Sequence, residues 1–113
     1  MTRVTRLLRE LIALPSVNPA FRPEGDAFAG EAGVADFLAG RARKAGLDVE
    51  FQKVFPGRSN LIVRLRPNGE VRGRVMMAPH MDTVGGDVEG GKLFRPVTRR
   101  GRLRGRGACG TKG

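Results

Sequence analysis

The sequence has no tryptophan and no tyrosine, and its six phenylalanines are its only aromatic residues. A single cysteine, Cys109, excludes an internal disulfide framework. No stretch approaches the roughly 20 consecutive apolar residues that a membrane-spanning helix needs. Arg3, Arg6 and Arg9 interrupt the apolar residues of the N-terminus, so it lacks the apolar run of a signal peptide. These absences predict a cytoplasmic protein with no membrane partner.

Positive charge is in excess. Lysine and arginine together number 21 against 11 aspartates and glutamates, which gives a net charge of +10. Lysine occurs only at Lys44, Lys53, Lys92 and Lys112, so arginine supplies most of this charge. Such a charge attracts polyanions at long range. The arginines are spread along the whole chain, however, which favours a solvated surface over a dedicated binding segment.

Two helices are predicted, in a chain of 113 residues that is long enough for one domain at most. Apolar residues recur at helical spacing over 2–14, with Thr2 as a candidate cap and Pro15 as the stop. A second helix is predicted over 30–45, and Gly46 then occupies the position where a glycine commonly ends a helix. The proline-rich stretch between these helices predicts a loop over 15–29.

The middle of the chain predicts strands. Apolar and polar residues alternate over 47–52, which indicates a strand with one solvated face. Residues 59–66 predict a second strand, and Asn68-Gly69 predicts a tight turn that pairs it with a third. That third strand is the continuous apolar run Val75–Ala78, whose composition is typical of a strand buried on both faces. We therefore expect an α/β fold in which helices cover a partial mixed sheet.

His80, the only histidine, follows this apolar run directly. Ligands of open α/β sheets bind at the carboxyl ends of strands, where His80 is expected to lie. Asp82 follows two residues later, so in extended backbone the two side chains point to the same side. A carboxylate beside an imidazole fixes its tautomer and leaves the other nitrogen for a metal. A structural histidine at a strand end remains the alternative, because one histidine is too few ligands for zinc.

The chain closes on GRGACGTKG, residues 105–113. Gly105 and Gly110 have the spacing of a phosphate-binding P-loop, but Thr111-Lys112 reverses the required order of lysine and hydroxyl, so we reject this interpretation.

Arginines among glycines also suit a phosphate backbone. The segment RRGRLRGRG and the strand-like pieces around 93–98 and 102–105 fit an exposed hairpin, but no aromatic residue lies within this segment to stack bases. A nucleic-acid-binding module is therefore the alternative function, and a solvated surface is the simpler interpretation of these arginines.

Four segments in order resemble the M20 family of zinc metallopeptidases and amidohydrolases. They are LLRELIALPSVNP at 7–19, APHMDTV at 78–84, the glycine-rich stretch that follows, and GRGACGTKG. The residues of APHMDTV and ACGTKG most resemble those of enzymes of the acetylornithine deacetylase and succinyl-diaminopimelate desuccinylase type. The resemblance runs along nearly the whole chain but reaches only the N-terminal part of such an enzyme. We therefore expect residues 1–113 to be an incomplete portion of a zinc-peptidase-like catalytic domain, with no second domain.

The resemblance implies a two-zinc centre, in which cobalt can substitute, that hydrolyses the amide bond of N-acylated amino acids or short peptides. His80 corresponds to a metal ligand, and Asp82 to the catalytic-site aspartate that orients it. The family's next motif has a metal-bridging aspartate where this chain has Gly110. The general-base glutamate, the other ligands and the domain that makes many family members homodimers fall beyond the matched part. The resemblance thus predicts the family's chemistry but an inactive polypeptide when residues 1–113 stand alone; a non-functional remnant is a further alternative.

Overall fold

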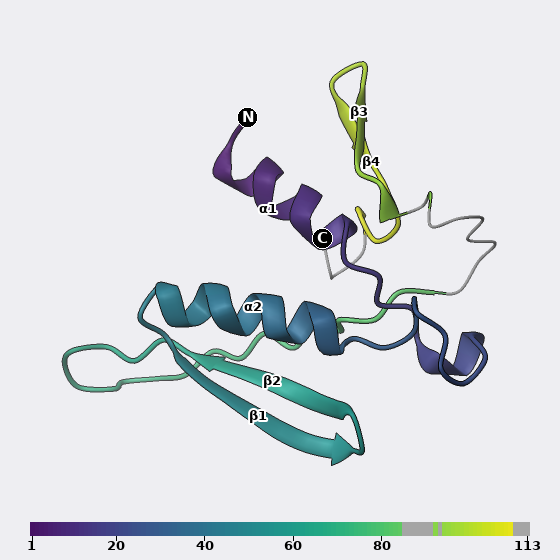
Figure 1. Ribbon diagram of the computed structural model, residues 1–113. Coiled ribbons are helices and arrows are strands. Elements are labelled where there is room, and N and C mark those ends of the chain that lie inside the picture. Colours follow the sequence, from purple (N-terminus) through teal and green to yellow (C-terminus); the bar gives the residue numbers. More distant parts are fainter. Residues whose placement is uncertain (85–91, 93, 110–113) are drawn as a thin grey trace.

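The computed structural model describes residues 1–84, 92 and 94–109. Its elements, in chain order, are α1 (Arg3–Ile12), the 3-10 helix η1 (Pro19–Phe21), α2 (Ala32–Lys44), β1 (Asp48–Phe55), β2 (Arg58–Arg64), β3 (Val97–Arg99) and β4 (Arg102–Arg104). Within the described ranges the strands form two separate antiparallel hairpins, β1–β2 and β3–β4. Figure 1 shows α2 lying along β1–β2, while α1 lies near β3–β4. The chain therefore combines α and β structure, as expected, but the described strands form two antiparallel hairpins instead of the expected partial mixed sheet.

The predicted helices are confirmed. The Thr2 side chain accepts a hydrogen bond from the Thr5 amide at 3.1 Å, which satisfies one of the free donors at the start of α1. The second helix is followed by Gly46 in the left-handed conformation, with φ of 77°. Leu11 and Ile12 of α1 are buried, as are several small residues of α2, namely Val34, Ala35, Ala39 and Ala42.

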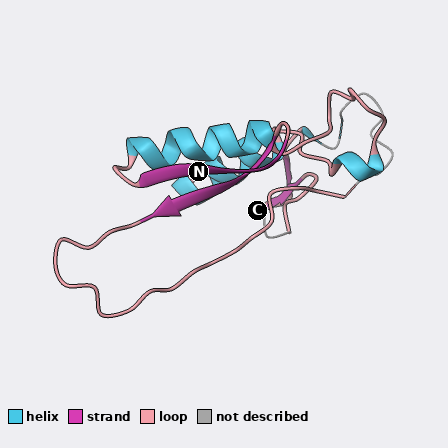
Figure 2. Cartoon of the chain, turned by 90° about the horizontal axis from the view of Figure 1, so that it is seen from below, coloured by secondary structure: helices cyan, strands magenta, loops and turns pink. Residues whose placement is uncertain are grey.

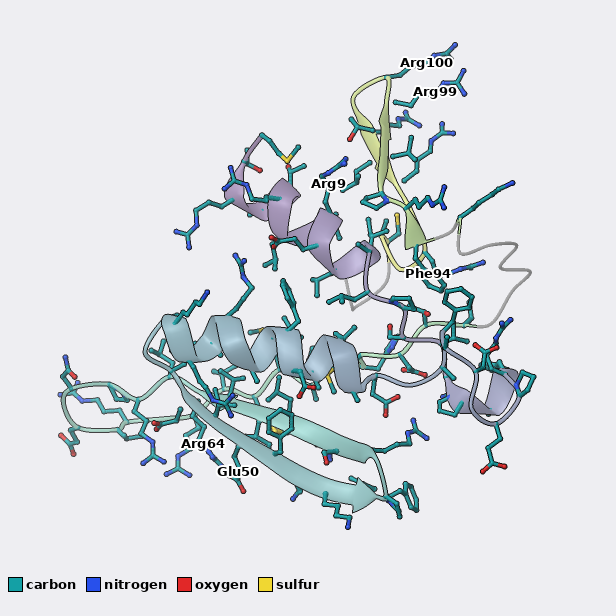
Figure 3. All side chains as sticks on the ribbon, in the orientation of Figure 1. Arg9, Glu50, Arg64, Phe94, Arg99 and Arg100 are labelled. Atoms are coloured by element: carbon teal, nitrogen blue, oxygen red, sulfur yellow. The ribbon has the colours of Figure 1, made fainter. Side chains whose placement is uncertain are left out.

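The β1–β2 hairpin has one polar face, as the alternation over 47–52 predicts. Glu50 lies opposite Ile62, and its carboxylate accepts a hydrogen bond from Nη1 of Arg64 at 2.8 Å. Figure 3 shows Glu50 and Arg64 on the side of the hairpin away from α2. Gln52 on the same face accepts a hydrogen bond from its cross-strand neighbour Asn60 at 3.1 Å. The solvated face is thus organised by cross-strand polar pairs.

The prediction of a strand at Val75–Ala78 is wrong, and so is the prediction that this strand pairs with 59–66 across Asn68-Gly69. Residues 65–82 form no strand, and the run leaves Val75, Met76 and Met77 exposed at 95%, 88% and 87%. Figure 2 shows this segment as a long loop that departs from β2. A strand that is apolar on both faces needs covering layers on both sides. Among the described elements α2 covers one face of β1–β2, so pairing would leave half of the run in water.

A small apolar cluster combines residues that precede β1 with one residue that precedes β3. Val17 and Phe94 are buried, and the Phe28 ring packs against Phe94 with centroids 5.2 Å apart. The cluster joins the loop after α1 to the segment before β3. No helix in the described part of the chain is long and apolar enough to cross a membrane.

Candidate functional site

Backbone hydrogen bonds bring residues 16–18 beside residues 82–84, far apart in the sequence. The Thr83 amide donates to the Ser16 carbonyl at 2.8 Å, and the Asn18 amide donates to the Thr83 carbonyl at 2.9 Å. The two segments thereby form an isolated parallel bridge between Val17 and Thr83. Pro19 favours extended backbone at the preceding residue, Asn18, whose amide takes part in this bridge. The APHMDTV segment is therefore positioned by the Pro-Ser-Val-Asn-Pro loop rather than by a sheet.

Asp82 is held by Asn18. Nδ2 of Asn18 donates to Oδ2 of Asp82 at 2.8 Å, while Oδ1 of Asn18 accepts from the Ala20 amide at 3.0 Å and caps η1. Because the amide oxygen is used by a backbone donor, the amide nitrogen must face the carboxylate. The hydrogen bond from Asn18 is the main cause that lowers the pKa of Asp82, and His80 contributes in the same direction. Asp82 is therefore a carboxylate at neutral pH.

His80 lies beside this carboxylate. Its Nδ1 is 3.1 Å from Oδ1 of Asp82 and 3.0 Å from the Asp82 backbone oxygen. Both neighbours are acceptors, so Nδ1 carries the proton in the neutral ring and Nε2 keeps its lone pair. The side chain is 62% exposed, which leaves the ring accessible from solvent. The structure therefore brings the two predicted site residues together.

A shallow hollow of about 270 Å³ opens beside His80 and Asp82. Its charged lining also includes Glu31, at the start of α2, and Arg58, the first residue of β2. Nε of Arg58 donates to Oε1 of Glu31 at 2.8 Å, and this hydrogen bond is the main cause that raises the pKa of Arg58. Two carboxylates and one guanidinium give the lining an excess negative charge, which favours a cation when His80 is neutral.

Sequence reasoning missed Asn18, Glu31 and Arg58 as parts of this site. Asn18 lies 64 positions from Asp82 in the chain, and Glu31 lies 27 positions from Arg58. Neither pair shares a motif or a helical or strand spacing. The flanking prolines mark residues 15–19 as a rigid loop, but nothing in the sequence indicates which distant side chain that loop contacts.

The described residues do not complete a zinc site. No group of three or more histidine, cysteine, aspartate or glutamate side chains gathers at a metal-binding spacing in the described part of the chain. Zinc centres use three or four protein ligands, whereas the hollow offers Nε2 of His80 and carboxylates already engaged by Asn18 and Arg58. Cys109 is exposed, and Gly110 lies outside the described residues. One imidazole, oriented by one carboxylate, is what the site supplies.

No protein family model matches the chain, and no match was found among the curated proteins or the solved structures.

Proposed function

We propose that the chain carries part of the catalytic centre of an M20-type zinc amidohydrolase, in which Nε2 of His80 is one metal ligand and Asp82 orients the ring. Its substrates would be N-acylated amino acids or short peptides, and its chemistry amide hydrolysis in the cytoplasm. The bound zinc would supply an acidified water as the attacking group. The role of this chain would be to hold the lone pair of His80 Nε2 in a fixed direction.

The observation that carries the proposal is the position of Nδ1. Its two acceptors at 3.0 and 3.1 Å, Asp82 O and Asp82 Oδ1, select the Nδ1–H tautomer. Asp82 is in turn held by Asn18 at 2.8 Å, so the chain of contacts fixes the ring from behind. Such a carboxylate–histidine arrangement is typical of metal-binding histidines, because it fixes the tautomer and the orientation of the ring.

The described residues fall short of the full ligand set, and this limits the proposal for residues 1–113 alone. A second dication would lack the bridging carboxylate that the resemblance assigns to position 110, where glycine has no ligand atom. We therefore expect no hydrolysis of N-acetylornithine by this polypeptide with zinc or with cobalt. Turnover that disappears in a His80→Ala variant would contradict the expected inactivity.

The ligand role is tested by nitrogen NMR of the ring, whose signals need no assignment because the chain has one histidine. We expect the Nδ1–H tautomer in the neutral protein, and zinc should perturb Nε2 selectively. A Cys109→Ser background removes the exposed thiol that would compete for the metal.

Asp82→Ala should shift the tautomer toward Nε2–H and weaken the zinc response, because the ring loses its carboxylate partner. Asp48→Ala is the matched control, since it removes a carboxylate of β1 outside the hollow. A wild-type ring in the Nε2–H form, or equal effects of the two variants, would overturn the assignment of His80 and Asp82.

A further inference from the structure

The β3–β4 hairpin divides its side chains between two faces. Val97 lies opposite Arg104, Thr98 opposite Leu103, and Arg99 opposite Arg102. Because side chains alternate along a strand and opposite residues share a face, Val97, Arg99, Arg102 and Arg104 lie on one face. Nη1 of Arg9 in α1 donates to Oγ1 of Thr98 at 2.9 Å, so the other face is turned toward α1. We call the first of these faces the arginine face.

Among the described residues, no negative charge compensates the arginine face. Residues 94–109 contain no aspartate or glutamate, and no ion pair among the described residues involves their arginines. Arg99 and Arg102 lie directly opposite each other, an arrangement of like charges that weakens a hairpin. An anion placed over this face would relieve that repulsion.

The turn of this hairpin adds a fourth arginine under strain. Arg100 has φ of 50° and Gly101 has φ of 70°, as in the turns that favour asparagine, aspartate or glycine at the first position. Arg100 is the single non-glycine residue with positive φ in the described ranges. Figure 3 shows Arg99 and Arg100 extending outward at the tip of the hairpin. An arginine does not favour this turn conformation. An arginine at the tip does, however, favour the binding of an anion there.

The hairpin is also fixed against α1. A Cβ at Gly105 would overlap the side chain of Ile12, so the chain after β4 lies directly on this buried residue. Together with the hydrogen bond from Arg9 to Thr98, this contact orients the arginine face before any ligand arrives. Preorganisation of this kind lowers the entropy lost on binding.

We propose that the arginine face and Arg100 bind the phosphate backbone of duplex DNA without reading its sequence. Guanidinium groups bind phosphate oxygens in pairs, and a two-stranded ribbon fits the major groove. Single-stranded nucleic acid is a poorer fit, because no residue of β3 or β4 is aromatic and bases would lack a stacking partner. A membrane is also a poorer fit, because Val97 is the one apolar side chain on the face.

The test measures the fluorescence anisotropy of a labelled duplex against the full chain at several salt concentrations. Four phosphate contacts predict a slope of log affinity against log salt of about −3.6. Arg102→Gln should weaken binding and reduce the slope by about 1. Arg64→Gln, on the polar face of β1–β2, is the matched control with the same change in net charge, and it should leave the slope unchanged.

Arg100→Asn separates binding from folding, because it should weaken DNA binding while raising the melting temperature of the protein. Failure to bind duplex, tighter binding of a single strand of equal length or of anionic phospholipid vesicles, or equal losses in Arg102→Gln and Arg64→Gln would each overturn the proposal. None of these measurements depends on zinc or on His80.

Discussion

The two hairpins of this chain differ in the charges that face each other across their strands. On the polar face of β1–β2, Arg64 pairs with Glu50 and Arg66 pairs with Asp48. On the corresponding face of β3–β4, Arg99 and Arg102 face each other without a carboxylate. Opposite charges across a hairpin stabilise it and like charges destabilise it. The first hairpin therefore has cross-strand charges that stabilise it, whereas among the described residues the second has like charges with no carboxylate to offset them.

The turns of the two hairpins also differ in how well their residues suit the backbone conformation. The β1–β2 turn is Pro56-Gly57, with glycine at φ of 72°, so each residue suits its backbone conformation. The β3–β4 turn places Arg100 at positive φ, where a side chain other than asparagine, aspartate or glycine is strained. Local sequence and local structure agree in the first hairpin and conflict in the second. Such conflicts are most common where a surface serves binding.

The largest effect is expected at Gly105, where β3–β4 meets α1. Gly105→Ala places a Cβ against buried Ile12, and overpacking of this kind typically costs about 1–3 kcal/mol of stability. Urea unfolding measures the loss, and NMR shifts should change in α1 and β3–β4 but not in β1–β2. Gly73→Ala is the control, because a Cβ there meets nothing within 4 Å. Equal losses in the two variants would show that the hairpin is not packed on Ile12.

A gain is expected when the strained turn is repaired. Arg100→Asn relieves a left-handed conformation that costs about 1–2 kcal/mol for an ordinary residue, so we expect roughly 1 kcal/mol of added stability. Thermal unfolding is the measurement. The control is Arg95→Asn, which removes an exposed arginine outside the turn. Loss of stability in Arg100→Asn would mean that the arginine makes contacts that its backbone strain conceals.

The second hairpin should become more like the first when one arginine is reversed in charge. Arg102→Glu places a carboxylate opposite Arg99, which is expected to stabilise the hairpin by about 0.2–1 kcal/mol. The uncharged variant Arg102→Gln should give less, because it removes repulsion without adding attraction. Amide hydrogen exchange in β3 and β4 reports the difference. Identical exchange in the two variants would show that the cross-strand charges do not interact.

Features with local causes could be predicted from the sequence. The cap at Thr2, the glycine stop at Gly46 and the alternation in β1 each depend on residues a few positions apart, and each is confirmed. The neighbouring positions of His80 and Asp82 also follow from a spacing of two residues. Metal binding by His80 stays a prediction, because the described residues do not supply a group of three candidate ligands.

Features with distant causes could not be predicted. The apolar run Val75–Ala78 has the composition of a buried strand, but burial depends on partners that no local pattern specifies. The same reason hid the contact between Asn18 and Asp82, which joins two loops through one side-chain hydrogen bond. The two hairpins illustrate the boundary: their strands were predicted from local patterns, but the helix against which each hairpin lies was not.

A pH effect is expected at the candidate site. The folded pKa of Asp82 lies below its unfolded value, chiefly through Asn18, so its contribution to stability is present above the unfolded pKa and is lost as pH falls through the folded pKa. Asn18→Ala should raise the pKa of Asp82 and reduce the contribution to stability that is lost at low pH. Carbon NMR of the Asp82 carboxyl measures it, with the Glu50 carboxyl as an internal control. An unchanged pKa of Asp82 would mean that the hydrogen bond from Asn18 does not hold this carboxylate.

The smallest effect is expected from the ion pair that defines the first hairpin. The side chains of Arg64 and Glu50 are 45% and 53% exposed, and solvent-exposed pairs contribute about 0.2–1 kcal/mol. A double-mutant cycle with Arg64→Gln and Glu50→Gln should give a coupling near the lower end of this range, and salt should reduce it. A coupling well above that range would show that the polar face of β1–β2 is shielded from water. A coupling of zero would mean that opposite charges on the first hairpin are as solvated as like charges on the second, and the contrast would then rest on the turns alone.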